Sequence, residues 1–164
     1  MRVMGVDPGL TRCGIAIVQE APSRKVELLQ VQVARTLPAL PVAERLRQLE
    51  RVLISVVQEF KPEVMAIEQI FSQHNLRSVM GTAQAAGVAM LVAARSEIKV
   101  VTHTPTQVKA AVTGSGRADK KQVTQMVRKI CNLKEDPKPA DAADAIALGI
   151  CNLWQNPKLT RRVS

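Results

Sequence analysis

Short apolar runs in this chain alternate with longer segments in which apolar residues recur at helical spacing. The short runs predict five strands, at residues 3–6, 14–18, 26–34, 64–68 and 98–102. The longer segments predict helices at residues 41–60 and 73–95, and three further helices between residues 104 and 154. Three opening strands followed by alternating helices and strands indicate an α/β domain with a five-stranded mixed sheet flanked by helices. We expect one domain over residues 1–157 and a short tail at residues 158–164.

Individual residues support several of these elements. The first long helix carries apolar residues spaced three and four apart, namely Leu46, Leu49, Leu53, Val56 and Phe60. The arginines of this helix are predicted to lie on its other faces, and they are Arg45, Arg47 and Arg51. Thr104 with Gln107, and Asp119 with Gln122, have the spacing of capping pairs, so helices are expected to begin just after Thr104 and Asp119.

The overall composition limits the kinds of protein that this chain can be. With 164 residues, 46% of them hydrophobic, the chain is long enough for one packed core. The formal net charge of +9 favours an anionic partner, either nucleic acid or a membrane surface, and a basic surface without a special role is the alternative. No apolar run reaches membrane-spanning length and the first strand begins near the first residue, so we expect a cytoplasmic protein without a membrane partner.

Cysteine, histidine and aromatic residues are few. The cysteines are too widely spread for a disulfide framework and show no zinc-binding spacing with the two histidines, so we expect them in the core: Cys13, Cys131 and Cys151. Any bound metal is expected to be a hard cation held by oxygen, such as Mg²⁺ or Mn²⁺. Two phenylalanines, one tryptophan and no tyrosine are too few for a platform that stacks single-stranded bases. The expected target is therefore paired nucleic acid, bound through its phosphates.

Four carboxylates stand where strands end or a helix begins. Asp7 ends the first predicted strand and Glu68 ends the fourth, while Asp141 and Asp144 are three apart and share one face of the last helix. If the first and fourth strands are parallel neighbours, Asp7 and Glu68 lie side by side where ligands gather in α/β sheets, and the last helix completes the cluster. Such a cluster in a basic chain indicates divalent metal held against a polyanion, as in a magnesium-dependent nuclease. Helix capping is the alternative for Asp141 alone.

Basic residues near helix starts are candidates for DNA contacts. Lys120 and Lys121 follow the cap residue Asp119, where the helix dipole favours acids, so either lysine is a candidate for contact with phosphate. A solvated lysine pair is the alternative. Further candidates rest on charge and loop location alone, and they are Arg12, Arg77 and Arg117.

The helix predicted at residues 73–95 contains glycines and several alanines. Glycine inside a helix costs about 1 kcal/mol relative to alanine, and small residues let another backbone approach closely. This helix, which carries Gly81, Ala85 and Gly87, is therefore expected to pack tightly on its own sheet or against a second subunit.

Several segments carry a specific resemblance when they are taken together. Residues 1–14 read MRVMGVDPGLTRCG, residues 67–71 read IEQIF, and residues 140–145 read ADAADA. Residues 81–88 read GTAQAAGV and residues 104–109 read TPTQVK. Each segment alone is weak, but in this order and spacing the set resembles the RuvC family of Holliday junction resolvases over nearly the whole chain.

The resemblance implies an RNase H-like fold and a homodimer that makes paired nicks in opposing strands of a four-way DNA junction, at a short preferred sequence. It implies cooperation with the RuvA–RuvB branch-migration complex. It also implies that the four carboxylates hold two Mg²⁺ ions per subunit, with Mn²⁺ as a substitute; we expect Asp7 to bridge the two ions. Lys109 and Lys120 are implied to support catalysis and Phe71 to lie at the junction centre, although without the resemblance Lys109 reads as an ordinary exposed lysine and Phe71 as a core residue.

Two other classes of protein have to be weighed. Asp7-Pro8-Gly9 followed by Gly14 also resembles the first phosphate loop of actin-like ATPases, but those proteins clamp nucleotide between two lobes and this chain has length for one. A junction-binding module without catalysis is the non-enzyme alternative. Such a module has no need for four acids facing DNA, because without metal each acid repels phosphate.

Overall fold

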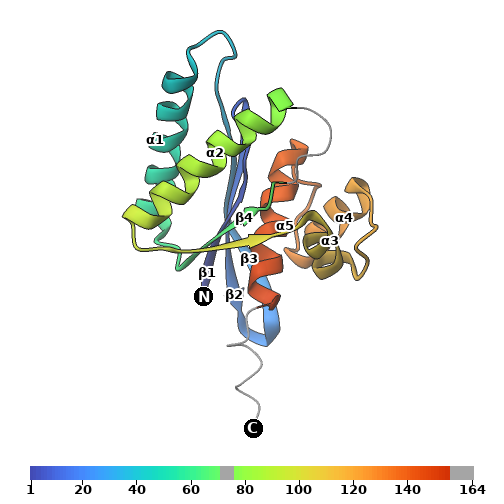
Figure 1. Ribbon diagram of the computed structural model, residues 1–164. Helices are drawn as coiled ribbons and strands as arrows, with labels where there is room; N and C mark the ends of the chain where they lie inside the picture. The colour runs from blue at the N-terminus through green and yellow to red at the C-terminus, as the bar shows by residue number, and fades with distance from the viewer. Residues whose placement is uncertain (71–75, 156–164) are drawn as a thin grey trace.

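The computed structural model describes residues 1–70 and 76–155 (Figure 1). Its strands are β1 (Arg2–Asp7), β2 (Arg12–Ala21), β3 (Lys25–Arg35), β4 (Val64–Glu68) and β5 (Lys99–His103). Its helices are α1 (Val42–Phe60), α2 (Leu76–Arg95), α3 (Pro105–Thr113), α4 (Lys120–Ile130) and α5 (Ala140–Gln155). A single 3₁₀ turn, Pro22–Arg24, joins β2 to β3.

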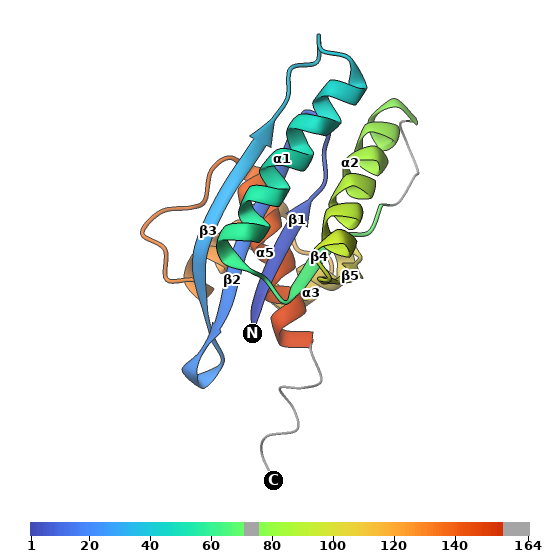
Figure 2. The same ribbon diagram turned by 90° about the vertical axis from the view of Figure 1, so that its left-hand side faces the viewer.

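The strands form one mixed sheet in the order β3-β2-β1-β4-β5. β1 runs antiparallel to β2, and β2 runs antiparallel to β3, whereas β1, β4 and β5 are parallel. α1 and α2 cover one face of the sheet, and α5 covers the other face with α3 and α4 beside it (Figures 1 and 2). The carboxyl ends of β1, β4 and β5 therefore share one edge of the sheet, which is where ligands bind in α/β folds.

Side chains along β1 alternate between two cores. Met4 and Val6 join the core beneath α1 and α2, where they meet Leu53. Val3 joins the core beneath α5, where it meets Ile146. Because helices cover both faces, the central strands are apolar on both sides, which explains their near-continuous hydrophobic runs.

Glycines let α5 lie unusually close to the sheet. A Cβ atom at Gly5 would stand 2.0 Å from the backbone oxygen of Ala145, and one at Gly14 would stand 2.2 Å from the backbone oxygen of Asp141. Any larger residue at these positions would push the helix away. Gly14 pairs with Asp7 in the sheet. The first turn of α5 is therefore held next to the carboxyl end of β1.

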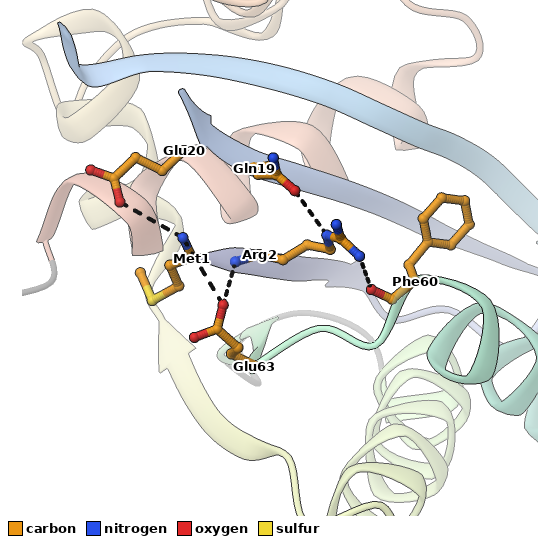
Figure 3. A network of polar contacts seen from close by, with 6 residues as sticks. All are labelled: Met1, Arg2, Gln19, Glu20, Phe60 and Glu63. Atoms are coloured by element: carbon orange, nitrogen blue, oxygen red, sulfur yellow. Dashed lines mark hydrogen bonds and ion pairs between the residues drawn. The ribbon is translucent and has the colours of Figure 1, made fainter. Parts of the chain in front are cut away.

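The opposite end of β1 is fixed by a separate polar network (Figure 3). The backbone N–H of Arg2 donates to Glu63 at 3.0 Å, and its side-chain Nε donates to Gln19 at 3.0 Å. The Arg2 guanidinium also donates to the backbone carbonyl of Phe60. The network joins β1 to β2 and to the segment between α1 and β4, so the central strand is anchored away from the edge where its carboxylate lies.

The predicted architecture is confirmed in its main features. All five strands form, and most extend one to three residues beyond the predicted ends. Both capping pairs are present, with Thr104 accepting from the Gln107 N–H at 3.1 Å and Asp119 accepting from the Gln122 N–H at 2.8 Å. The three cysteines are buried as expected. Within residues 1–70 and 76–155, none of the helices has the length and apolar character needed to cross a bilayer.

One prediction for α1 was wrong. Arg45 was expected on a polar face, but only 8% of it is exposed. Its position one and two helical turns before Leu49 and Leu53 places all three residues on the same buried face. The predicted helix start at residue 73, the predicted tail and Phe71 lie outside the described residues.

Candidate active site

Two of the predicted carboxylates end neighbouring strands. β1 and β4 are parallel, and Val6 pairs with Ile67, so the residues that follow them, Asp7 and Glu68, stand next to each other at the sheet edge. Each is only partly buried, whereas the residues before them are fully buried. The predicted side-by-side placement of these two carboxylates is therefore present in the structure.

The other two carboxylates come from the first two turns of α5. Asp141 and Asp144 are both partly buried, and the buried faces of their neighbours Ala142, Ala143 and Ala145 hold the helix against the sheet. Because Gly14 lets the backbone of Asp141 come close to β2, the acidic face of α5 opens towards the carboxyl ends of the strands.

All four carboxylates line one cleft of about 270 Å³, which we call the acid cleft. Its remaining walls come from α3 and α4, through Pro105, Val108, Lys109, Lys120 and Val123. A second hollow of about 210 Å³ shares Asp7, Glu68 and Pro105 with the acid cleft. It extends towards α2, and its other lining residues are Pro8, Gln69, Ile70, Val79 and Thr82. The two hollows therefore adjoin at the carboxyl ends of β1 and β4.

Burial and mutual repulsion change the protonation of the carboxylates at the strand ends. Burial first, then the charges of Glu68, Asp144 and Asp141, raise the pKa of Asp7 from 3.8 to about 7. Burial and the charge of Asp144 also raise the pKa of Glu68, while Lys120 and Lys109 lower it. A site in which one carboxylate is this hard to ionise is a favourable place for a cation.

Two cations of the chain already face the α5 carboxylates. Arg12 Nη2 lies 2.6 Å from Asp141 Oδ2, and Lys120 Nζ lies 3.4 Å from Asp144 Oδ2. The Asp141 oxygen is buried and receives no hydrogen bond of good geometry, so its contact with Arg12 is mainly electrostatic. The charge of Asp144 raises the pKa of Lys120, which keeps this lysine fully charged.

The donor set of the acid cleft fits a hard divalent cation. Its carboxylates supply only oxygen atoms, which suits Mg²⁺ or Mn²⁺ and does not suit softer metals. As the described side chains stand, no three acids, histidines or cysteines come close enough together to enclose one ion. The pairing of Asp141 with Arg12 and of Asp144 with Lys120 directs these two carboxylates towards the protein's own cations.

The predicted basic residues divide into two groups. Lys109 and Lys120 line the acid cleft. Lys121 is exposed next to Lys120. Arg117 lines a different hollow of about 420 Å³ between the loop that joins α3 to α4 and one face of α4. Arg77 belongs to the first turn of α2, but its side chain lies outside the described residues, as does Phe71.

The small residues of α2 also divide into two groups. Ala85 and Ala89 are fully buried against the sheet. Gly81 faces Leu10 of the same chain, because a Cβ atom there would stand 3.3 Å from the Leu10 Cβ. Gly87 is exposed and has open space around it. The outward face of α2 also carries large apolar residues, with exposed fractions of 60% at Met80, 39% at Met90 and 47% at Leu91.

Sequence reasoning missed two features of the site. It treated Arg12 only as a candidate for phosphate contact, and the pairing with Asp141 depends on a tertiary approach that no local pattern shows. It also placed Arg45 on a solvent face, although the spacing to Leu49 and Leu53 was a usable signal for burial.

Comparison with known proteins agrees with this site. The chain matches the family described as "Crossover junction endodeoxyribonuclease RuvC" over residues 3–152. The protein of that name from Salinispora arenicola is 53% identical over 98% of this chain and 92% of its own length, and the one from Rhodococcus jostii is 55% identical over 98% and 85%. The structure of T. thermophilus RuvC in complex with a Holliday junction substrate has a TM-score of 0.88 and 34% identity, covering 93% of this chain and 92% of that one. The chain belongs to the RuvC family of crossover junction endodeoxyribonucleases.

Proposed function

We propose that this protein resolves four-way DNA junctions by metal-dependent hydrolysis of phosphodiester bonds in the acid cleft. The observation that carries the proposal is the gathering of four carboxylates in one cleft of a chain with a formal net charge of +9. A clustered negative charge in a DNA-binding protein repels the substrate unless cations are bound there. The T. thermophilus relative, solved with a Holliday junction substrate, supports the same substrate for this chain.

Asp7, Glu68, Asp141 and Asp144 would hold the metal, which we expect to be two Mg²⁺ ions with Mn²⁺ as a substitute. Bound divalent cations lower the pKa of a water molecule and stabilise the charge that develops on the scissile phosphate. Asp7 is the best candidate for a shared ligand, because it is the acid on which the charges of the other three act. Arg12 and Lys120 would release Asp141 and Asp144 when these carboxylates turn to the metal.

The basic walls of the acid cleft would bind and orient the DNA. Lys109 and Lys120 lie on α3 and α4, opposite the carboxylates, so a phosphate in the cleft meets lysines on one side and the acid cluster on the other. A lysine in this position stabilises negative charge on the scissile group. Lys121 and Arg117 are exposed at and just before the start of α4 and would contact more distant phosphates. Phe71 and Arg77 remain predicted DNA contacts.

A symmetric junction gives a reason for two copies of the chain. We propose a homodimer with two-fold symmetry, so that one acid cleft faces each of two opposing strands. The outward face of α2, with Met80, Gly87, Met90 and Leu91, is the candidate interface because it exposes apolar side chains beside an open glycine. Ala85 belongs to the core and is not part of this surface. The resemblance also suggests that the RuvA–RuvB complex is a partner.

Labelled synthetic DNA tests the function directly. The protein is incubated with a four-way junction or with linear duplex of matched sequence, with Mg²⁺ or with chelator, and with or without ATP. We expect paired nicks in the junction only, dependent on the metal and independent of ATP. Binding of the junction without cutting under any metal would favour the binding module, and hydrolysis of ATP without cutting would favour the ATPase lobe. Either result would refute the proposal.

A further inference from the structure

A buried arginine on α1 stands apart from the acid cleft but contacts the turn that leads out of it. Arg45 is 8% exposed, although arginine is seldom buried without a carboxylate partner because removal of its charge from water costs several kcal/mol. Over residues 1–70 and 76–155, Arg45 takes part in no ion pair. Its partners are two hydroxyl groups: Nε donates to Thr36 Oγ1 at 2.8 Å, and Nη2 donates to Thr11 Oγ1 at 2.7 Å.

The two threonines extend this contact into the backbone of the turn. The Thr36 hydroxyl donates to the backbone carbonyl of Leu10, and the Thr36 N–H donates to the carbonyl of Thr11 at 3.1 Å. Arg45 therefore ties together α1, the residue after β3, and the turn between β1 and β2. We call this set of hydrogen bonds the Arg45 clamp.

The clamped turn connects two residues of the acid cleft. It begins after Asp7, which ends β1, and it ends at Arg12, the first residue of β2 and the partner of Asp141. From the other side, Leu10 packs against Gly81 of α2. The turn is thus fixed by directional hydrogen bonds on one side and by packing on the other, and a displacement of the turn moves both Asp7 and Arg12.

We propose that Arg45 is a positioning residue for the reaction, which fixes Asp7 in the geometry that the metal requires and Arg12 in the geometry that the scissile strand requires. A purely stabilising role does not explain the choice of residue, because a well-packed apolar side chain is usually as stable as a buried charge or more so. The planar guanidinium can donate to two separate hydroxyls at once, which lysine cannot do. The inference rests on the proposed nuclease function.

The main test compares Arg45→Met with Arg51→Met. Arg51 is an exposed residue of the same helix, so its replacement removes the same charge without disturbing the clamp. For Arg45→Met we expect junction affinity within about twofold of the wild type, because Arg45 is buried and does not face DNA. We expect the cleavage rate at saturating junction to fall by roughly 10²-fold, as for a displacement of reacting groups by about 1 Å. Arg51→Met should cut at the wild-type rate.

A second readout separates positioning from general stability. Calorimetric titration of Mn²⁺ into the protein without DNA should show weaker binding for Arg45→Met than for Arg51→Met, measured at a temperature where both variants are folded. Arg45→Lys should restore the charge but only part of the rate. Thr11→Val keeps Arg45 and removes one acceptor at an exposed position, so it should lower the rate by about tenfold, as for one hydrogen bond to a charged group.

Unchanged cleavage rate and Mn²⁺ binding in a folded Arg45→Met protein would overturn the proposal. If that variant does not fold, Thr11→Val provides the test, and a wild-type cleavage rate in Thr11→Val would also overturn the proposal. Wild-type protein that leaves junctions intact would remove the proposed nuclease function instead, while the Mn²⁺ titration would still test whether Arg45 positions the carboxylates.

Discussion

Replacement of Asp7 by asparagine should make the metal-free protein more stable at alkaline pH while it abolishes cleavage. Burial and three neighbouring carboxylates raise the pKa of Asp7 from 3.8 to about 7. A carboxyl whose pKa is raised in the folded state favours folding at low pH, and this contribution is lost as the pH rises from about 4 through about 7. Asparagine has nearly the same shape and no charge, so the stability of the variant should not fall with rising pH through this position.

The magnitude follows from the two pKa values. A pKa change from 3.8 to about 7 corresponds to about 4 kcal/mol between the two protonation states. Between pH 4.5 and pH 8, the linkage relation gives a loss of roughly 3 kcal/mol in the wild-type free energy of unfolding from this group alone. The difference in stability between Asp7→Asn and wild type should grow by that amount over the same interval. Added Mg²⁺ should then stabilise the wild type by binding only its folded form, and the variant much less.

Urea unfolding in the presence of chelator, at pH 4.5 and pH 8, measures this difference. Glu59→Gln, which removes one exposed carboxylate from α1, is the control. Its difference in free energy of unfolding from the wild type should be the same at both pH values. Cleavage and junction binding are measured on the same preparations, and Asp7→Asn should lose cutting but bind the junction as tightly as the wild type or more tightly. A stability difference that stays constant between the two pH values would refute the electrostatic account of the acid cleft. Loss of junction binding in folded Asp7→Asn would refute the assignment of Asp7 to the metal.

Three further substitutions test the cations and the dimer. Lys120→Ala should reduce the slope of log affinity against log salt by about one if the lysine contacts phosphate before cleavage, whereas an unchanged slope with slower cutting assigns it to the transition state. Arg12→Gln should tighten Mn²⁺ binding up to about fivefold in calorimetry, because it removes a half-exposed guanidinium that competes with the metal for Asp141. Weaker Mn²⁺ binding in this variant would contradict the prediction and show that Arg12 holds the carboxylate in place for the metal. Gly87→Arg should give monomers in sedimentation and should convert a supercoiled cruciform plasmid to relaxed circles. The wild type should make the same plasmid linear by coupled nicks. If the variant is still a dimer and still makes linear product, the outward face of α2 is excluded as the dimer interface.

The sequence predicted most of the architecture because the determining signals were local. Continuous apolar runs in the central strands reflect burial on both faces of the sheet, and the capping pairs at Thr104 and Asp119 are short-range hydrogen bonds. The shared position of Asp7 and Glu68 followed from one topological condition, the parallel pairing of β1 with β4, which the structure fulfils. The roles of the site residues stay predictions.

The remaining features depend on distances that a linear pattern does not contain. Arg45 was misplaced because its charge outweighed its helical position, although it shares a face with Leu49 and Leu53. The partnership of Arg12 with Asp141 arises only because Gly14 lets α5 approach β2. In both cases a residue type suited to solvent occupies a position that tertiary contacts define, and such exceptions occur mainly near functional sites.

The distribution of charge in the acid cleft connects folding with metal binding. The two carboxylates of α5 each face a cation of the chain, so their repulsion is partly neutralised within the protein. Asp7 pairs with neither of these cations and is the carboxylate whose pKa rises to about 7. Burial and the repulsion of the other three carboxylates therefore act together on Asp7, and a bound divalent cation would relieve the repulsion. The same electrostatic energy that weakens the metal-free fold at alkaline pH then strengthens metal binding, so stability and metal affinity should change in opposite directions when the carboxylates of this cleft are replaced one at a time.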